Sequence, residues 1–250
     1  MNRDSNAYTF GFAAVMVIVV ASVLAFAATS LQDLQAENVR KEKMQNILAT
    51  IGIEIDREAA EGKFNEYIVS QLSLRKDGSI DPQVDAFSDI KLAIEVKKEV
   101  DEQRFPIYVA NVENEKYYII PLRGAGLWDA IWGYISLKSD KNTIKGVVFD
   151  HKAETAGLGA EITTQWFQDR FIDEKVFAED GTLKGIAVSK TNNDPNNLDK
   201  NDHEVDAISG ATITGDGVTD MIIERMQYYI PYFEKEKESA ATLNDLNYVQ

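Results

Sequence analysis

The sequence predicts an α+β protein, with one N-terminal transmembrane helix followed by a globular domain that has a twisted, mainly antiparallel sheet and flanking helices. Three observations support this fold class. No residue from Ser5 to Gln32 is charged, strand-like segments in the middle of the chain come in pairs separated by polar turns, and apolar residues near the C-terminus recur with helical spacing.

The first element is a predicted membrane anchor in residues 1–30. Phe10 to Ala28 is almost wholly apolar, and at about 1.5 Å per residue a helix of this length crosses a bilayer core. A cleaved signal peptide is the alternative, because Ala25-Phe26-Ala27 has the small-x-small pattern of a cleavage site. The apolar region of a signal peptide is usually only about 7–15 residues long, which favours an uncleaved anchor.

The charges that flank the anchor bear on its orientation. Arg3 is the only basic residue before the apolar segment, whereas Arg40, Lys41 and Lys43 follow it. Counted by the positive-inside rule, these charges place the large domain in the cytoplasm, although large domains are also translocated against the count.

The segments that follow are predicted as a stalk, a sheet and further helices. Residues 31–52 repeat apolar side chains at roughly helical spacing, which indicates a helical stalk that could pack on a neighbouring subunit. Five segments have the pattern of strands, and the last four of them form two hairpins: Ile90–Val100, Phe105–Val112, Tyr117–Leu122, Trp132–Leu137 and Ile144–Phe149.

The C-terminal half is predicted to contain two helices, one more hairpin and a loop. Glu161–Phe171 has the pattern of a short helix, and Val176–Lys190 that of a hairpin around Asp180-Gly181. Thr191–Glu204 is rich in Asn and Asp, so we expect an exposed loop. An amphipathic helix is predicted from near Gly215, and Pro231 is expected to kink or end it.

Composition excludes several functions. With 26 basic and 41 acidic side chains the net charge is −15, which argues against binding to nucleic acid. The chain has no cysteine, so it forms no disulfide and holds no iron–sulfur cluster through its own thiolates. His151 and His203 lie in no metal-binding motif, and we predict no metal site. There is also no plausible Ser/His/Asp set and no phosphate-binding GxxxxGK[ST] loop.

The candidate site is the small-residue turn that leads into the last helix, Asp206-Ala207-Ile208-Ser209-Gly210-Ala211-Thr212-Ile213-Thr214. Such a turn offers free backbone N–H groups and the positive end of a helix dipole to an anion such as phosphate. Gly210 and Ala211 allow a bulky group to approach the backbone, while Ser209, Thr212 and Thr214 supply hydroxyl groups. The alternative interpretation is an ordinary N-cap that only satisfies the first amides of the helix.

Ser209-Gly210-Ala211-Thr212, with Asp206 ahead of it, resembles the flavinylation motif of the FMN-binding domain family. In that family a flavin transferase, with FAD as donor, esterifies the last threonine to FMN phosphate. The resemblance therefore implies that the cofactor is FMN, bound covalently through a phosphoester to Thr212, with Ser209, Gly210 and Ala211 beside it. Thr214 is the nearest alternative hydroxyl.

Two further stretches resemble the same family. His151 to Gly159, followed by Trp166 and Phe171, is similar to a stretch that helps to enclose the flavin ring, although Ala156 stands where the family usually has proline. The ring contacts implied in this stretch are Glu154, Thr155, Gly157, Leu158 and Gly159, and turn geometry alone is the other explanation for the two glycines.

The third stretch runs from Arg123 to Trp128 and continues in Trp132-Gly133-Tyr134. Trp128 either flanks the flavin or packs in the core, the commoner fate of such a residue, and Trp132 and Trp166 are assigned to packing. Lys190 aligns with a family lysine close to the cofactor, and a solvated surface lysine is the alternative.

Within this family the chain resembles, over nearly its full length, the C subunits of Na⁺-translocating NADH:quinone oxidoreductases. The related G subunits of the Rnf electron-transport complex are the alternative, and a non-redox scaffold anchored in the envelope is an alternative of another class. The resemblance implies an electron relay in a complex that couples NADH oxidation and quinone reduction to sodium export, with flavin, iron–sulfur and multi-span subunits as partners. It also implies a single-pass protein of the bacterial inner membrane with a periplasmic flavin domain, contrary to the charge count.

The sequence thus predicts a division into an anchor (1–30), a stalk (31–52), an α/β insertion that packs on the flavin domain (53–122), the FMN-binding domain (123–238) and a C-terminal tail (239–250).

Overall fold

A five-stranded antiparallel sheet forms the centre of the domain, and its strands follow one another in chain order, β1-β2-β3-β4-β5. The computed structural model describes residues 5–247, with side chains up to residue 239. The strands are β1 (Ile68–Leu74), β2 (Phe105–Val112), β3 (Glu115–Ala125), β4 (Ala130–Leu137) and β5 (Ile144–His151). Both predicted hairpins, β2–β3 and β4–β5, are confirmed.

The turn between β2 and β3 shows why this hairpin closes so tightly. Glu113 and Asn114 are the only residues between the two strands, and both have positive φ, 53° and 69°. Positive φ at both central residues is the geometry that matches the twist of two-residue hairpins.

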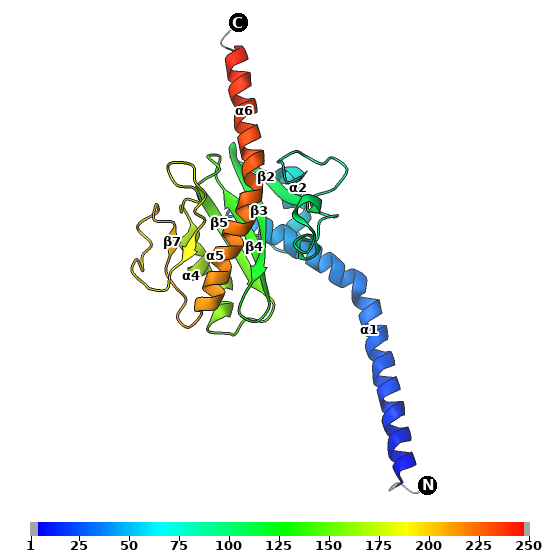
Figure 1. Cartoon of the computed structure of the whole chain (residues 1–250). Coiled ribbons are helices and arrows are strands. Elements are labelled where there is room, and N and C mark those ends of the chain that lie inside the picture. Colours follow the sequence, from blue (N-terminus) through cyan, green and yellow to red (C-terminus); the bar gives the residue numbers. More distant parts are fainter. Residues whose placement is uncertain (1–4, 248–250) are drawn as a thin grey trace. The chain divides into compact units, whose positions relative to one another are not determined.

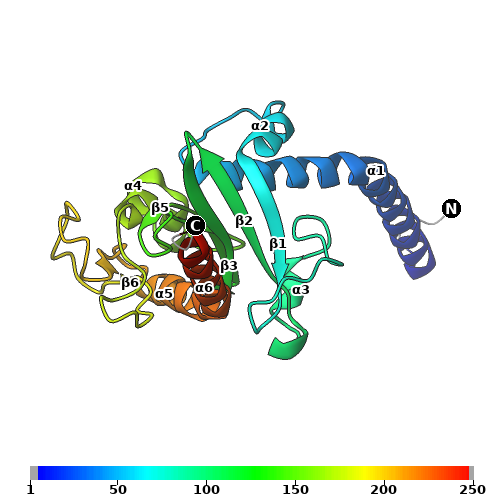
Figure 2. The same cartoon turned by 90° about the horizontal axis from the view of Figure 1, so that it is seen from above.

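The described residues also form helices and short helical turns (Figures 1 and 2). They are α1 (Asn6–Ala49), α2 (Ala60–Tyr67), α3 (Leu92–Glu95), η1 (Val100–Glu102), η2 (Gly159–Thr163), α4 (Gln165–Gln168), η3 (Asp169–Phe171), α5 (Thr212–Met226), η4 (Gln227–Tyr229) and α6 (Ile230–Asn247). A separate parallel pair joins β6 (Ala187–Val188) to β7 (Glu204–Val205).

The sheet separates two hydrophobic cores, because alternate residues of a strand point to opposite faces. In β2, Phe105, Ile107 and Val109 contribute to the larger core, together with residues of α5 such as Met221 and Ile222. The smaller core lies on the other face. It contains Met44, Ile47, Leu48, Ile51, Phe64, Tyr108, Ala110, Tyr117 and Ile119.

Helix α1 is the one helix of the described residues that is long and apolar enough to cross a membrane, and no residue of its apolar segment is buried. The chain divides into two units, residues 1–43 and 44–250. Met44, Ile47, Leu48 and Ile51 of the predicted stalk belong to the second unit and are buried within this chain. The apolar character of these four residues is therefore explained by packing within this chain and not by packing on a neighbouring subunit. Leu31 and Leu34, earlier in the predicted stalk, are exposed.

The predicted strand Ile90–Val100 is wrong. This segment contains α3 and η1 instead, and the edge of the sheet next to β2 is occupied by β1, which was not predicted. The alternating pattern misleads because the charged residue is buried and the apolar residue beside it is exposed. Glu95 is only 5% exposed, and its Oε2 accepts a hydrogen bond from Arg104 N (3.0 Å). Ile94 is exposed.

The segments after the sheet differ from the prediction in detail. Glu161–Phe171 is helical but divides into η2, α4 and η3. The hairpin expected in Val176–Lys190 is reduced to a single bridge between Phe177 and Leu183, because β6 pairs with β7 rather than with the start of the segment. The loop before β7 is mostly exposed, as expected, except that Asn197 is buried.

The last helices follow the prediction with shifted ends. Helix α5 begins at Thr212, three residues before the predicted start. Pro231 falls in the first turn of α6, where a proline is tolerated because its missing N–H has no helical partner. The helical turn η4 separates the two helices. The boundary expected at residue 122/123 falls within β3, and α6 extends into the segment expected as a tail.

Candidate flavin site

The turn that carries the predicted attachment residue lies at the start of α5. Ala211, with φ −117° and ψ 32°, precedes the helix, and Thr212 is its first residue. Gly210 has φ +74°, a conformation that glycine adopts at little cost, and Ala211 N donates to Ile208 O (3.0 Å) to close the turn. The first backbone N–H groups of α5 have no partner within the helix and are therefore available to an anion at this end.

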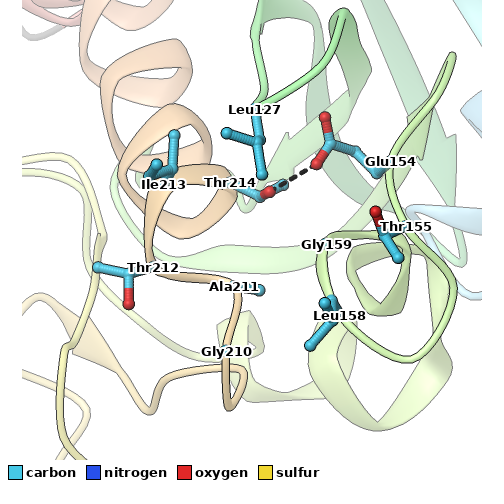
Figure 3. A pocket seen from close by; sticks show the side chains of 10 residues that line it. All are labelled: Leu127, Glu154, Thr155, Leu158, Gly159, Gly210, Ala211, Thr212, Ile213 and Thr214. Atoms are coloured by element: carbon cyan, nitrogen blue, oxygen red, sulfur yellow. Dashed lines mark hydrogen bonds between the residues drawn. The ribbon is translucent and has the colours of Figure 1, made fainter.

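A second segment, which connects β5 to η2, faces this turn (Figure 3). Gly157 has φ +75°, and its N–H donates to Glu161 Oε1 (3.0 Å). Leu158 N donates to Thr155 O (3.1 Å), so the segment folds back on itself. Leu158 remains 40% exposed at the edge of the site.

Glu154 joins the two segments to a third. Its Oε2 accepts a hydrogen bond from Thr214 Oγ1 (2.6 Å), and its Oε1 accepts one from Trp128 N (3.0 Å), in the connection between β3 and β4. The Glu154 backbone N–H donates to His151 Nδ1 (3.1 Å). Figure 3 shows the bond between Thr214 and Glu154 crossing the space between α5 and the facing segment.

These segments enclose an open cavity of about 220 Å³. Its lining combines hydroxyl groups, backbone and aliphatic side chains: Leu127, Glu154, Thr155, Leu158, Gly159, Gly210, Ala211, Thr212, Ile213 and Thr214. A flat, largely apolar ring with a phosphate tail suits such a lining, since the ring can contact aliphatic groups while the tail reaches a helix N-terminus.

The structure distinguishes the two candidate threonines. Thr214 is 1% exposed, and its hydroxyl donates to Glu154. Thr212 is exposed, two residues earlier in the same turn, and its side chain lies away from Glu154 (Figure 3). A bulky group can be attached only to a hydroxyl that is accessible, which favours Thr212.

Seven of the predicted site residues line the cavity: Glu154, Thr155, Leu158, Gly159, Gly210, Ala211 and Thr212. Ser209 and Gly157 lie next to lining residues without lining it themselves. Lys190 is also outside the lining. It is exposed, and its Nζ lies 3.7 Å from Asp216 Oδ2 in α5.

The three tryptophans lie in different environments. Trp128 is 67% exposed, and its Nε1 donates to Thr155 Oγ1 (3.2 Å), so it lies beside the cavity and not in the core. Trp166 is 45% exposed with the Arg170 guanidinium 5.0 Å from its ring centre, and Trp132 is half-buried. The packing expected of Trp166 is therefore wrong, since this residue projects from the short helix α4 and is exposed.

Sequence reasoning missed Leu127 and Ile213 as lining residues and did not foresee the bond between Thr214 and Glu154. Ile213 is 58% exposed and Leu127 46% exposed. Apolar side chains that remain exposed beside a glycine-rich turn are the signal that points to them, because they form part of the wall of the cavity.

The fold and the site together define an FMN-binding domain protein, and the FMN-binding domain family matches residues 126–227. The structure is similar to that of the Na(+)-translocating NADH-quinone reductase C subunit from Parabacteroides distasonis, with a TM-score of 0.72 and 38% identity over 81% of this chain and 96% of that chain. The chain therefore belongs to the family of C subunits of Na(+)-translocating NADH-quinone reductases.

Other relatives agree with this assignment. The C subunit from Neisseria meningitidis serogroup A is 29% identical over 96% of this chain and 98% of its own length. The C subunit from Vibrio campbellii is 28% identical over 87% of this chain and 89% of its own length. The NqrC structure from Shewanella oneidensis, at 22% identity and a TM-score of 0.66, supports the fold. The Rnf G subunit is accordingly not favoured.

Proposed function

We propose that this chain carries FMN in a phosphoester bond to Thr212 and relays electrons as the C subunit of a Na⁺-translocating NADH:quinone reductase. The observation that carries the proposal is the exposed hydroxyl group of Thr212 at the N-terminus of α5, beside a cavity with an aliphatic wall. A phosphate attached there lies at the positive end of a 15-residue helix.

The other residues divide into a phosphate side and a ring side. Ser209, Gly210 and Ala211 belong to the phosphate side, where small side chains leave the backbone accessible. On the ring side, Thr155, Leu158 and Gly159 line the cavity, Gly157 shapes their turn, and Trp128 lies at the edge. Lys190 reaches α5 through its ion pair with Asp216, and it is the lysine proposed for the phosphate side.

Bound flavin supplies reversible electron transfer, and the protein supplies its position and electrostatic surroundings. The attachment is a group transfer from FAD, catalysed by a flavin transferase. The Thr212 oxygen forms a bond to the phosphorus on the FMN side of the pyrophosphate, the bond between that phosphorus and the bridging oxygen breaks, AMP leaves, and the hydroxyl proton is released.

Intact-mass measurement tests the attachment. The chain is co-expressed with a flavin transferase, and peptides that contain Ser209 to Thr214 are then mapped. We expect one FMN phosphoryl adduct on Thr212, none in Thr212→Ala, and a retained adduct in the matched control Thr214→Val. Covalent flavin in Thr212→Ala would refute the attachment site.

The same measurement separates the electron relay from the scaffold alternative. A scaffold would use the Thr212 turn only as a helix start, so the wild-type chain would purify without flavin even with an active transferase. Thr212→Ala would then change stability alone.

The proposed location is the bacterial inner membrane, with α1 as a single span and the flavin domain in the periplasm. The other subunits of the complex, including its flavin, iron–sulfur and multi-span subunits, are the proposed partners. The length and apolar character of α1 support the anchor, while the charges after the span count against the periplasmic orientation. Fusion of an alkaline phosphatase reporter after Gln250 decides the orientation, because this reporter is active only in the periplasm.

A further inference from the structure

Among the described residues, Glu154 is the one acidic side chain that lines the flavin cavity. Glu154 is only 8% exposed, so most of its side chain is enclosed by protein. Its two oxygens accept hydrogen bonds from different segments, Oε2 from Thr214 in α5 and Oε1 from Trp128 N in the β3–β4 connection.

Two glycines leave room for this carboxylate. A Cβ added at Gly126 would lie 2.5 Å from Glu154 Oε1, and one added at Gly159 would lie 2.5 Å from Thr214 Oγ1 and closer still to Glu154 Oε2. The carboxylate therefore occupies space that exists only because both neighbours lack a side chain. Its two hydrogen bonds restrain it in this space.

No basic side chain of the described residues compensates the charge of the carboxylate. Both hydrogen bonds are donated to it, as an ionised carboxylate requires. Among residues 5–239 no lysine or arginine forms an ion pair with it, and the nearby Lys152 pairs with Asp129 (2.8 Å). His151 Nδ1 accepts the Glu154 N–H, so that ring nitrogen carries no proton toward it. An enclosed charge with this environment acts more strongly on its neighbours than a solvated one.

We infer that Glu154 has two tasks in this protein: it positions the start of α5 against the ring-side segment, and its fixed negative charge lowers the reduction potential of the bound flavin. The inference rests on the proposed FMN site. Reduction of the flavin takes electrons from the preceding donor and adds negative charge to the ring unless protons follow, so a fixed anion beside the cavity disfavours the reduced form.

Two variants separate charge from structure because they are expected to act in opposite directions. Glu154→Gln keeps the size of the side chain and removes its charge, and the Thr214 hydroxyl can rotate to accept from the new amide. The reduction potential of the flavin should rise by about 30 mV. For a two-electron couple this is a roughly tenfold increase in the ratio of reduced to oxidised flavin at a fixed solution potential. Thr214→Val removes one donor that stabilises the carboxylate and should lower the potential.

The experiment is a spectroelectrochemical titration of the flavinylated full-length chain in detergent at pH 8. The matched control is Glu161→Gln. Glu161 belongs to the same stretch of chain as Glu154, but its carboxylate does not line the cavity, so its removal should shift the potential less. A higher potential in Glu154→Gln and a lower one in Thr214→Val support the inference. Shifts of both variants in the same direction, or a Glu154→Gln value equal to that of Glu161→Gln, overturn it.

Two outcomes distinguish this inference from the proposed function. A wild-type chain that takes up no flavin refutes the proposed function itself, whereas a flavinylated wild type with an unchanged potential in Glu154→Gln refutes only the role of Glu154. If Glu154→Gln fails to take up flavin, Thr214→Val decides alone: a lower potential supports the inference, and an unchanged or higher one overturns it.

Discussion

At the residue scale, the site depends on which side chains and which glycines meet at Glu154. The serine, glycine, alanine and threonine of residues 209–212 were identifiable in the sequence because they form a contiguous motif. The pairing of Glu154 with Thr214 was not, since the two residues are 60 positions apart and only the fold brings them together. Local patterns carry information about turns and caps, but not about the partner of a buried polar group.

Substitutions of Gly157 and Gly159 in the ring-side segment separate the effect of a steric clash from the effect of backbone strain. Gly159→Ala should lower flavin occupancy and destabilise the domain by about 1–3 kcal/mol, because its Cβ collides with Thr214 and Glu154. Gly157→Ala has open space but a φ of +75°, and should cost about 1 kcal/mol without displacing Glu154. Chemical unfolding together with the flavin-to-protein absorbance ratio measures both effects.

The control for these variants is Gly62→Ala, in the exposed part of α2 with nothing within 4 Å of an added Cβ. It should leave flavin uptake unchanged and raise stability slightly. Equal losses of flavin in Gly157→Ala and Gly159→Ala would contradict the role assigned to the space around Glu154.

A second prediction at this scale concerns Glu174, which is fully buried and lies 3.5 Å from Lys200 Nζ, with Asn197 Nδ2 at 3.0 Å. Burial raises the pKa of Glu174 to about 7 from an ordinary value of 4.5, against the opposing effect of Asn197 and Lys200. Between about pH 4.5 and about pH 7 the Glu174 carboxyl group is therefore protonated in the folded protein and ionised in the unfolded chain. The free energy of unfolding should fall by roughly 3 kcal/mol as the pH rises from about 4.5 to about 7.

Urea unfolding at pH 5 and pH 7.5 tests this dependence. Glu174→Gln should flatten the difference in unfolding free energy between the two pH values, because an amide does not titrate. The exposed neighbour Glu179→Gln should leave the difference as it is in the wild type. A wild-type stability that rises between the two pH values would show that other groups dominate.

At the element scale, the hairpins and the amphipathic helix were predictable and the first strand was not. The four strands β2 to β5 have β-branched and aromatic residues bounded by polar turns, a signal that tertiary contacts reinforce. The segment Ile90–Val100 has the same alternation, but its charged residue Glu95 finds backbone and Lys98 partners in a helical turn. Without knowledge of those partners, alternation alone favoured the wrong segment over β1.

One acidic side chain of α6, Glu236, forms polar contacts with the sheet and the β4–β5 connection. Glu236 accepts hydrogen bonds from Tyr118 Oη (2.7 Å) and Lys116 Nζ (2.6 Å), and Lys141 Nζ lies 2.8 Å away. Burial alone would raise the pKa of Glu236, but these hydrogen bonds outweigh it and lower the pKa to about 2. The stabilisation is thus fully present above about pH 4.5 and is lost as the pH falls toward 2.

Glu236→Gln should therefore reduce the free energy of unfolding by about 1–3 kcal/mol at neutral pH, and by little at pH 3 and below. Glu234→Gln, on an exposed position of the same helix, should change it little at either pH. Thermal unfolding followed by circular dichroism distinguishes the two variants. An equal effect of both would indicate that the network around Tyr118 contributes nothing to stability.

At the scale of the whole molecule, the N-terminal apolar helix, four of the five strands and the helix after residue 211 were predicted, whereas the continuity of the sheet was not. The sheet runs without interruption from β1 to β5, across the boundary expected at residue 122/123. The sequence changes character near that point, because glycine and tryptophan become frequent. Strand pairing nevertheless continues through this point.

The compact unit that starts at Met44 leads to a prediction about truncation. A chain that begins at Met44 should fold and remain soluble, because it retains every residue of the smaller core. A chain that begins at Ile53 loses Met44, Ile47, Leu48 and Ile51, each worth about 1.5–3 kcal/mol when buried. The sum is comparable with the total stability of a typical domain, so this shorter chain should be largely unfolded.

The test is to measure, for each truncated chain, the yield of soluble protein and the cooperativity of thermal unfolding. A folded chain that starts at Ile53 would show that the end of α1 contributes no more than surface packing.

The packing of Glu154 against Gly126 and Gly159 also limits which amino-acid replacements these three positions can accept during evolution. The three positions share one small volume, so a methyl group gained at either glycine is tolerable only if position 154 gives up atoms at the same time. Accepted replacements at these sites should therefore arrive together in a lineage, and each single replacement should be a poor intermediate. Random mutagenesis that selects for flavin colour should recover changes at these positions as pairs far more often than chance allows.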